Sequence, residues 1–127
     1  MNITILGGGN IGMCLVGEIS RYKKYDVTIF ASHPEQFGKT IQVTDDEKEI
    51  TYTSGEFKAT DNIETAISGA DVILCTLPAF LRQDIIKKMT PYIKSDAFLG
   101  FFPGYGGAEF FYNLIGKAVG ENGHRFV

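Results

Sequence analysis

The sequence has few residues of the kinds that bind metals or form disulfides. It contains 2 cysteines and 2 histidines among 127 residues. Cys14 and Cys75 lie far apart, and neither belongs to a Cys-x-x-Cys pair or another metal-ligand spacing. The sequence therefore predicts no metal site, no disulfide and no catalytic thiol. Both cysteines are expected to be small buried thiols in a reducing compartment.

Basic residues and long apolar runs are also scarce. The chain has 12 Lys and Arg against 15 Asp and Glu, which gives a net charge of −3. Such a balance predicts no nucleic-acid surface. No apolar run approaches the ~20 residues of a membrane span, and the first residues do not resemble a signal peptide. A hydrophobic content of 44% is ordinary for one globular domain, which we expect to be cytoplasmic.

Glycine, by contrast, is abundant, and its spacing near the N-terminus is informative. The apolar run at 3–6 predicts a strand buried on both faces, and apolar residues at helical spacing follow it. Those helical positions are Ile11, Leu15 and Ile19. Between strand and helix, Gly7, Gly9 and Gly12 form the pattern G-x-G-x-x-G. In this context the pattern predicts a dinucleotide-binding turn, and the alternative is a tight turn without a ligand.

Each of the three glycines has its own expected task. Gly7 allows the tight turn, Gly9 lets the backbone approach a pyrophosphate, and Gly12 lets the helix pack on the strand. The free N–H groups near Asn10 and Ile11 would then face the phosphates at the positive end of the helix dipole. The sequence thus predicts a pyrophosphate site at this helix N-terminus.

The end of the second predicted strand bears on the choice of cofactor. About 20 residues after the glycine motif, an acidic residue usually binds the ribose 2′-hydroxyl of NAD. This chain has Ser32 and His33 there. With no carboxylate to repel a 2′-phosphate, NADP is favoured slightly over NAD. The alternative, that the two residues only cap the next turn, stays open.

The whole pattern predicts an α/β fold, a Rossmann-type doubly wound parallel sheet with a small β-hairpin inserted at about residues 40–53. Asp61 and Glu64 are expected to form a capping box for a short helix. Further strands are expected at 57–60, 71–77, 97–102 and from 124. The helix at about 80–93 is expected to bury Leu81, Ile85, Met89 and Ile93 and to expose Arg82, Lys87 and Lys88.

Two strand ends carry a more specific resemblance. The glycine motif, the segment Leu77-Pro78-Ala79 and the loop Pro-Gly-Tyr-Gly-Gly-Ala-Glu-Phe at 103–110 together resemble the N-terminal domain of the opine dehydrogenases, the octopine and nopaline dehydrogenase family. The domain also resembles the cofactor-binding half of ketopantoate reductases. Opine dehydrogenases condense an amino acid with a 2-keto acid reductively, using NADH or NADPH, or run the reverse reaction.

The resemblance implies roles for the matching residues. Gly7, Gly9 and Gly12 would bind the pyrophosphate, and Leu77, Pro78 and Ala79 with Pro103 and Gly104 would flank the ribose and nicotinamide. It implies no catalytic residue here, because a helical C-terminal domain supplies the catalytic groups and much of the substrate site. Glu109 stands where a helix dipole favours a carboxylate, so a structural and a functional role are equally open for it. His124 is expected to be structural.

Residues 1–127 are therefore expected to form one dinucleotide-binding domain of a longer enzyme, inactive alone, with amino acid and keto acid bound through the missing domain. The rival interpretation is a free-standing nucleotide-sensing module, which needs no second domain. We expect no nucleic-acid or membrane partner, and the sequence indicates no oligomeric state.

Overall fold

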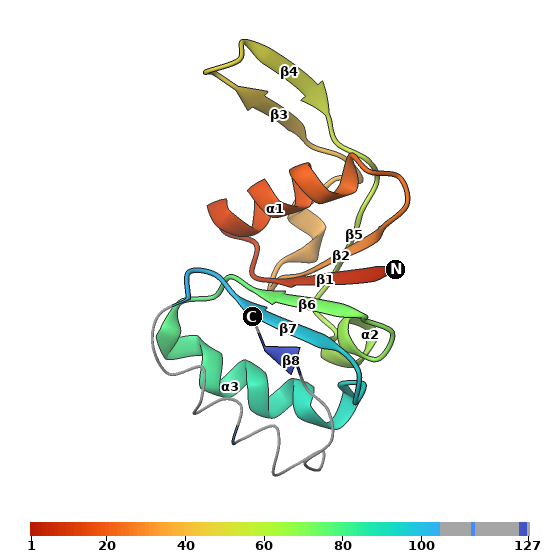
Figure 1. Cartoon of the computed structure of the whole chain (residues 1–127), viewed down its shortest axis with the longest axis vertical. Helices are drawn as coiled ribbons and strands as arrows, with labels where there is room; N and C mark the ends of the chain where they lie inside the picture. The colour runs from red at the N-terminus through yellow and green to blue at the C-terminus, as the bar shows by residue number, and fades with distance from the viewer. Residues whose placement is uncertain (105–112, 114–124, 127) are drawn as a thin grey trace.

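The computed structural model of the chain describes residues 1–104, 113 and 125–126. Its centre is a six-stranded sheet of order β5-β2-β1-β6-β7-β8, and all its pairings are parallel (Figure 1). These strands are β1 (Asn2–Leu6), β2 (Asp26–Phe30), β5 (Lys58–Thr60), β6 (Val72–Cys75), β7 (Phe98–Phe101) and β8 (Arg125–Phe126). Counted within the sheet alone, the order is 3-2-1-4-5-6, that of the dinucleotide-binding fold.

Strand β1 lies at the middle of the sheet because its side chains can be buried on both faces. Ile3, Ile5 and Leu6 are buried, as is Thr4 between them. The Thr4 hydroxyl donates a hydrogen bond of 2.5 Å to the Ala66 carbonyl, so its burial leaves that donor satisfied. A strand of this kind is typical of a sheet covered by helices on both sides.

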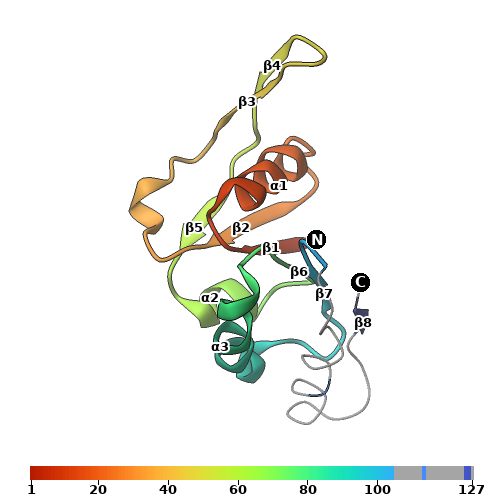
Figure 2. The ribbon, with the colours of Figure 1, turned by 90° about the vertical axis from the view of Figure 1, so that its left-hand side faces the viewer.

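Helices cover both faces of the sheet, as Figure 2 shows. They are α1 (Asn10–Ser20), α2 (Ile63–Ile67) and α3 (Ala79–Met89), with the short 3₁₀ turns η1 (Pro34–Gln36) and η2 (Thr90–Tyr92). Helix α1 packs on the face that carries Ile5 and Ile29, and α2 and α3 pack on the face that carries Leu6 and Ile73. The predicted doubly wound parallel sheet is therefore confirmed.

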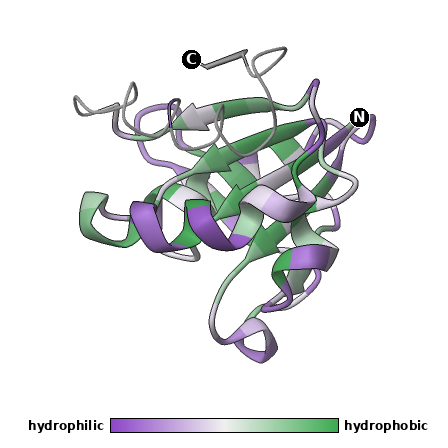
Figure 3. Ribbon diagram, turned by 90° about the horizontal axis from the view of Figure 1, so that it is seen from below, coloured by the Kyte–Doolittle hydropathy of each residue, from purple (hydrophilic) through white to green (hydrophobic). Residues whose placement is uncertain are grey.

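The sheet is the most apolar part of the molecule. Figure 3 shows the strands coloured mostly hydrophobic, while α3, in front of them, alternates between hydrophilic and hydrophobic segments. Ile85, Met89 and Ile93 are buried beneath α3 and η2, as predicted. Within the described residues, no helix has both the length and the apolar character that crossing a membrane requires.

The predicted hairpin is present as β3 (Gln42–Asp45) paired antiparallel with β4 (Ile50–Thr53), and it projects from the body of the domain (Figure 1). It rests on α1. A Cβ on Gly17 would lie 2.6 Å from Val43 Cγ2, so the close approach requires glycine. Farther along, the Tyr52 hydroxyl donates to the Glu18 carboxylate, and the Arg21 guanidinium lies 4.4 Å from the centre of the Tyr52 ring.

One local prediction about α1 and one about α2 are wrong. Asn62, not Asp61, caps α2, because its Oδ1 accepts the Thr65 N–H at 2.8 Å. Cys75 is buried as predicted, but Cys14 is exposed. The residues that α1 buries are mostly small, with Gly12 against the glycine turn and Gly17 against the hairpin, whereas Cys14 faces outward and Ile11 is 46% exposed. Those buried residues are Gly12, Val16, Gly17 and Ser20.

Candidate functional site

The glycine turn between β1 and α1 has the geometry that its sequence predicts. Gly7 has a φ of +115°, a conformation that residues other than glycine rarely adopt. Its N–H donates to the Phe30 carbonyl at 3.0 Å. On the other side, the Thr76 hydroxyl donates to the Leu6 carbonyl at 3.0 Å and lies 3.3 Å from that of Gly7. The turn is thus held between the ends of β2 and β6.

Gly12 and Gly9 differ in what surrounds them. A Cβ on Gly12 would lie 1.9 Å from the Gly7 carbonyl oxygen, so the third glycine is required for α1 to pack against the turn. Among the residues that the structure describes, none has an atom within 4 Å of a Cβ on Gly9. Gly9 therefore borders open space at the helix N-terminus, where a ligand can approach the backbone.

Within the described part of the chain, no side chain occupies the N–H groups at the N-terminus of α1. Gly9 is the N-cap, no side chain caps the helix, and its first turn holds no acidic residue. Asn10 and Ile11 are exposed there. Because the first N–H groups of a helix have no partner within it, this end can donate hydrogen bonds to a phosphate.

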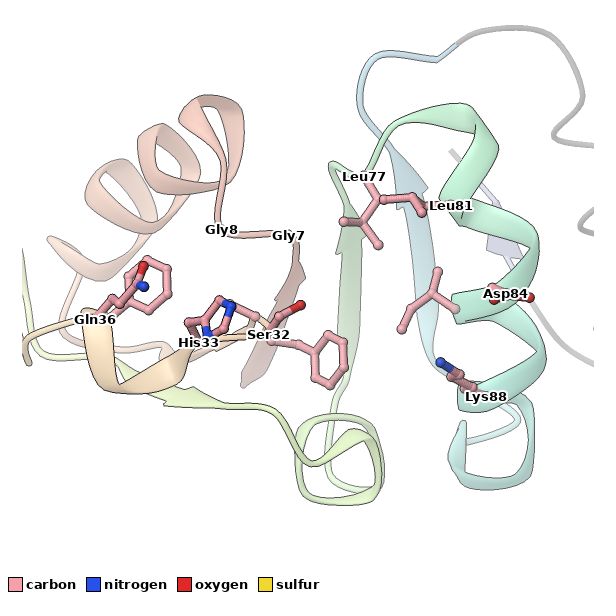
Figure 4. Close-up of a pocket in the computed structure, with 13 residues that line it drawn as sticks. Gly7, Gly8, Ser32, His33, Gln36, Leu77, Leu81, Asp84 and Lys88 are labelled. Carbon is pink, nitrogen blue, oxygen red and sulfur yellow. The ribbon is translucent and has the colours of Figure 1, made fainter.

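A cleft of about 420 Å³ opens beside the turn, at the carboxyl ends of β1, β2 and β6 (Figure 4). Gly7 and Gly8 lie between its two walls, of which one is formed by residues after β2 and the other by residues of α3. Four of the predicted site residues line it: Gly7, Ser32, His33 and Leu77. The other lining residues are Gly8, Phe30, Ala31, Gln36, Phe37, Leu81, Asp84, Ile85 and Lys88.

Ser32 and His33 are exposed at the mouth of this cleft. The sequence has no acid at these two positions, but the structure places one close by. A carboxylate oxygen of Glu35 lies 3.3 Å from His33 Nδ1. Any group bound beside His33 would therefore also meet the charge of Glu35.

Sequence reasoning missed the wall that α3 contributes. Leu81, Asp84, Ile85 and Lys88 follow the spacing i, i+3, i+4, i+7, so one helix face turns toward the cleft. Leu81 was predicted to be buried but is 42% exposed, because it borders the cleft. The position of α3 directly after β6 was the available signal, since helices after parallel strands begin beside the ligand crevice.

Phe37 is a second residue that the sequence did not indicate. A Cβ on Gly8 would lie 2.6 Å from Phe37 Cζ, so the ring packs over the glycine turn. This contact joins the segment after β2 to the glycine turn. Nothing in the local pattern around Phe37 predicts it, because the partner lies far away in the sequence.

The remaining predicted residues lie outside the cleft but at the same edge of the sheet. Pro78 and Ala79 begin α3, and Pro103 and Gly104 follow β7; all four are exposed. Arg82 connects the two segments. It was predicted to be exposed, but it is 2% exposed, and it donates from Nε to the Leu77 carbonyl and from Nη2 to the Pro103 carbonyl, both at 2.9 Å.

Arg82 is turned inward because the ends of β6 and β7 offer these two acceptors and the Phe101 ring, whose centre lies 5.4 Å from its guanidinium carbon. The prediction failed because helical periodicity does not show what a neighbouring strand end offers. The predictions for Glu109 and His124 lie outside the described residues.

The ionisable groups that line the cleft are His33, Asp84 and Lys88. Within the described residues, no group of three or more His, Cys, Asp or Glu side chains could hold a metal ion. The features present are an open helix N-terminus, a mostly apolar cleft and exposed strand ends, all at one edge of a parallel sheet. They fit a dinucleotide, because the helix N-terminus suits a pyrophosphate, the apolar cleft suits an adenosine and the exposed strand ends suit the second ring.

Comparison with known proteins agrees. The model of the family "NAD-dependent glycerol-3-phosphate dehydrogenase N-terminus" matches residues 2–100. Tauropine dehydrogenase of Arabella iricolor is 31% identical over 120 residues, which cover 85% of this chain and 30% of the relative. Octopine dehydrogenase of Pecten maximus is 31% identical over 121 residues, with 87% and 30% covered. The chain thus spans about 30% of the length of these relatives.

Solved structures show the same relation. An octopine dehydrogenase in complex with NADH and agmatine has a TM-score of 0.79 and 25% identity, over 91% of this chain and 31% of its own. A ketopantoate reductase from Ralstonia eutropha JMP134 shares the fold. Its TM-score is 0.68 and its identity 17%, over 99% of this chain and 40% of its own. The chain belongs to the family of the NAD-dependent glycerol-3-phosphate dehydrogenase N-terminus, and it is an NAD(P)-binding domain like that of the opine dehydrogenases.

Proposed function

We propose that this chain is the cofactor-binding part of an enzyme that reductively condenses an amino acid with a 2-keto acid, or runs the reverse reaction. The single observation that carries the cofactor role is the open helix N-terminus at Gly9, beside a cleft at the carboxyl edge of the sheet. The similarity to tauropine and octopine dehydrogenases supports the reaction class. The predicted cytoplasmic location stays a prediction.

The proposed roles follow the edge of the sheet. The backbone of Gly7 and 9–12 would bind the pyrophosphate, with Asn10 and Ile11 supplying N–H groups. Ser32 and His33 would contact the adenosine ribose in the cleft. The segments 77–79 and 103–104 would flank the nicotinamide. When bound, the cofactor supplies or accepts a hydride, and the chain's task is to hold and orient it.

The test of the cofactor role is a titration with NADH by calorimetry. Gly9→Val places a side chain in the space that the pyrophosphate needs, without touching the core. It should weaken binding at least about tenfold, or ~1.4 kcal/mol. Gly69→Val is the control, because Gly69 follows α2 and its Cβ would meet only Asn2 Nδ2 at 3.8 Å. Equal affinity of wild type and Gly9→Val would contradict the proposal.

For the cofactor type, we propose that NADPH binds more tightly than NADH. No carboxylate stands at Ser32 or His33, although a carboxylate oxygen of Glu35 lies 3.3 Å from His33 Nδ1. A charge-assisted hydrogen bond to the 2′-phosphate would contribute ~1.5–3 kcal/mol. The octopine dehydrogenase complexes with NADH favour the opposite choice. Titration with NADPH and with NADH measures which cofactor binds more tightly, and tighter binding of NADH would contradict the proposal. Glu35→Gln should raise the affinity for NADPH more than the affinity for NADH.

We further propose that the catalytic acid and the groups holding the substrate carboxylates lie in a second domain, as the greater length of the relatives suggests. Hydride transfer to an imine needs a positioned proton donor and exclusion of water. Residues 1–127, assayed with NADH or NADPH, pyruvate and a panel of amino acids, should therefore show no turnover near the ~1 s⁻¹ of ordinary enzymes. Turnover in that range would place the catalytic groups in this chain.

A further inference from the structure

Arg82 is a charged side chain that the domain buries almost completely. It is 2% exposed, although it lies in the first half of α3, whose neighbouring residues Gln83 and Asp84 are exposed. Burial of a guanidinium is unfavourable unless its donors find partners. Among the described residues, the guanidinium of Arg82 contacts two backbone carbonyls and an aromatic ring.

The partners of Arg82 belong to two different strand ends. Leu77 follows β6 and Pro103 follows β7, and these strands are neighbours in the sheet. Arg82 Nε and Nη2 donate to the carbonyls of Leu77 and Pro103 at 2.9 Å each. No backbone hydrogen bond of the β6–β7 ladder reaches that far, because the ladder ends with Cys75 paired to Phe101 and with the Phe102 N–H on the Cys75 carbonyl at 2.8 Å.

The guanidinium is suited to fixing the separation of the two segments. Its donors form a rigid planar fork, so two simultaneous hydrogen bonds set both the spacing and the relative orientation of the acceptors. The Phe101 ring, 5.4 Å from the guanidinium carbon, limits its movement further. A flexible or apolar side chain at this position would leave two carbonyls without these donors.

We propose that Arg82 is a positioning residue that holds segments 77–79 and 103–104 at the distance required for the nicotinamide ring to bind between them. The inference rests on the proposed function, since it assumes that the cofactor extends from the glycine turn past these strand ends. It assigns Arg82 no contact with the cofactor. Arg82 itself does not line the cleft, and the wall that holds Ser32 and His33 is formed by residues after β2, which Arg82 does not contact among the described residues.

The test compares two ligands that differ only beyond the second ribose. ADP-ribose fills the adenosine and pyrophosphate positions but has no nicotinamide, whereas NADH has it. Arg82→Met should lower the affinity for NADH until it equals that for ADP-ribose, and the affinity for ADP-ribose should change less than about twofold. It should also abolish any increase in nicotinamide fluorescence that accompanies NADH binding. Lys87→Met, which removes an exposed charge from the same helix, is the control.

The outcomes separate the inference from the proposed function. If wild-type protein binds neither ligand, the proposed function fails. If it binds both equally, or if Arg82→Met weakens both equally or neither, the inference is overturned. Should Arg82→Met fail to fold, the wild-type protein decides: the NMR signal of the Arg82 Nε–H should shift with NADH and stay in place with ADP-ribose. The same shift with both ligands would overturn the inference.

Discussion

At the scale of single residues, the glycine motif contains two positions with opposite constraints. Gly12 faces the Gly7 carbonyl and has no room for a methyl group, whereas Gly9 faces open space. The first position is therefore fixed by packing within the protein, and the second has no such constraint. A glycine without such a constraint at a helix N-terminus leaves the room that a ligand close to the backbone requires.

This contrast predicts a difference in stability between two alanine variants. Gly12→Ala should lower the free energy of unfolding by ~1–3 kcal/mol, because a Cβ 1.9 Å from an oxygen forces α1 away from the turn. Gly9→Ala should change it by less than ~0.5 kcal/mol. Urea denaturation followed by circular dichroism measures both. Equal stability of the two variants would show that α1 does not pack as closely as the structure has it.

The two cysteines are predicted to differ in reactivity. Cys14 is exposed, and Cys75 is buried at the end of β6, where burial raises the pKa of its thiol. The thiolate is the reactive form, so Cys75 is protected both by burial and by its protonation. A thiol reagent should label Cys14 in the native protein and Cys75 only after unfolding. Mass spectrometry of Cys14→Ser and Cys75→Ser variants assigns the label, and rapid native labelling of Cys75 would contradict its burial.

At the scale of elements, the hairpin is joined to the domain through α1. Gly17 of α1 contacts Val43 of β3, and the Tyr52 hydroxyl of β4 donates to Glu18. A two-stranded hairpin alone is marginally stable in water. The stability of the hairpin therefore depends on how closely β3 packs against α1.

We expect this fit to appear as coupling between Gly17 and Val43. Gly17→Ala should destabilise the domain, because its Cβ would stand 2.6 Å from Val43 Cγ2. Val43→Ala removes that methyl group, so the double variant should lose less stability than the two single losses combined. The coupling energy should lie in the range of ~0.5–3 kcal/mol found for residues in contact. Additive losses would mean that the hairpin does not rest on α1 at this point.

The elements that were predictable are those whose signal is local. The apolar run of β1, the spacing of Gly7, Gly9 and Gly12 and the alternation in the hairpin each specify an element without knowledge of its neighbours. The N-cap of α2 is Asn62, one residue after the predicted Asp61. Asp and Asn side chains can both cap a helix, so only the backbone geometry decides which of them does.

The features that could not be predicted depend on distant partners. Arg82 is buried because two strand ends present carbonyls to it, and the Phe37 ring packs directly on Gly8. Cys14 is exposed because α1 is buried through other residues, among them Gly12 against the glycine turn and Gly17 against the hairpin. The candidate site was therefore predictable at its glycine turn and strand ends, but not along the wall formed by α3.

At the scale of the whole molecule, one polar cluster joins three distant parts of the chain at the amino end of the sheet. Asp71, before β6, accepts the Asn2 N–H through Oδ2 at 2.7 Å and contacts Lys94 Nζ through Oδ1 at 2.5 Å. The cluster thus ties β1 and β6 to the segment that leads into β7. It lies at the edge of the sheet opposite the cleft beside the glycine turn, so its loss should leave the cleft unchanged.

This cluster predicts how stability depends on pH. The hydrogen bond from Lys94, followed by that from the Asn2 N–H, holds the pKa of Asp71 below its usual range. A carboxyl whose pKa is lower in the folded than in the unfolded protein stabilises the fold above its unfolded pKa, about 3.9 for Asp, and the contribution disappears as the pH falls through the folded value. Asp71→Asn should therefore be less stable than wild type at pH 7, and the difference should shrink as the pH falls below about 4.

Asp46→Asn provides the control, because it removes the same charge from an exposed position in the hairpin turn. Chemical denaturation of the three proteins from pH 7 down to pH 3 measures the effect, and high salt should reduce it, since exposed ion pairs are screened. If Asp71→Asn and Asp46→Asn have the same stability at neutral pH, the Asp71 cluster does not hold β1, β6 and β7 together. A difference that persists undiminished at low pH would instead assign the loss to the geometry of the Asn2 contact rather than to the charge.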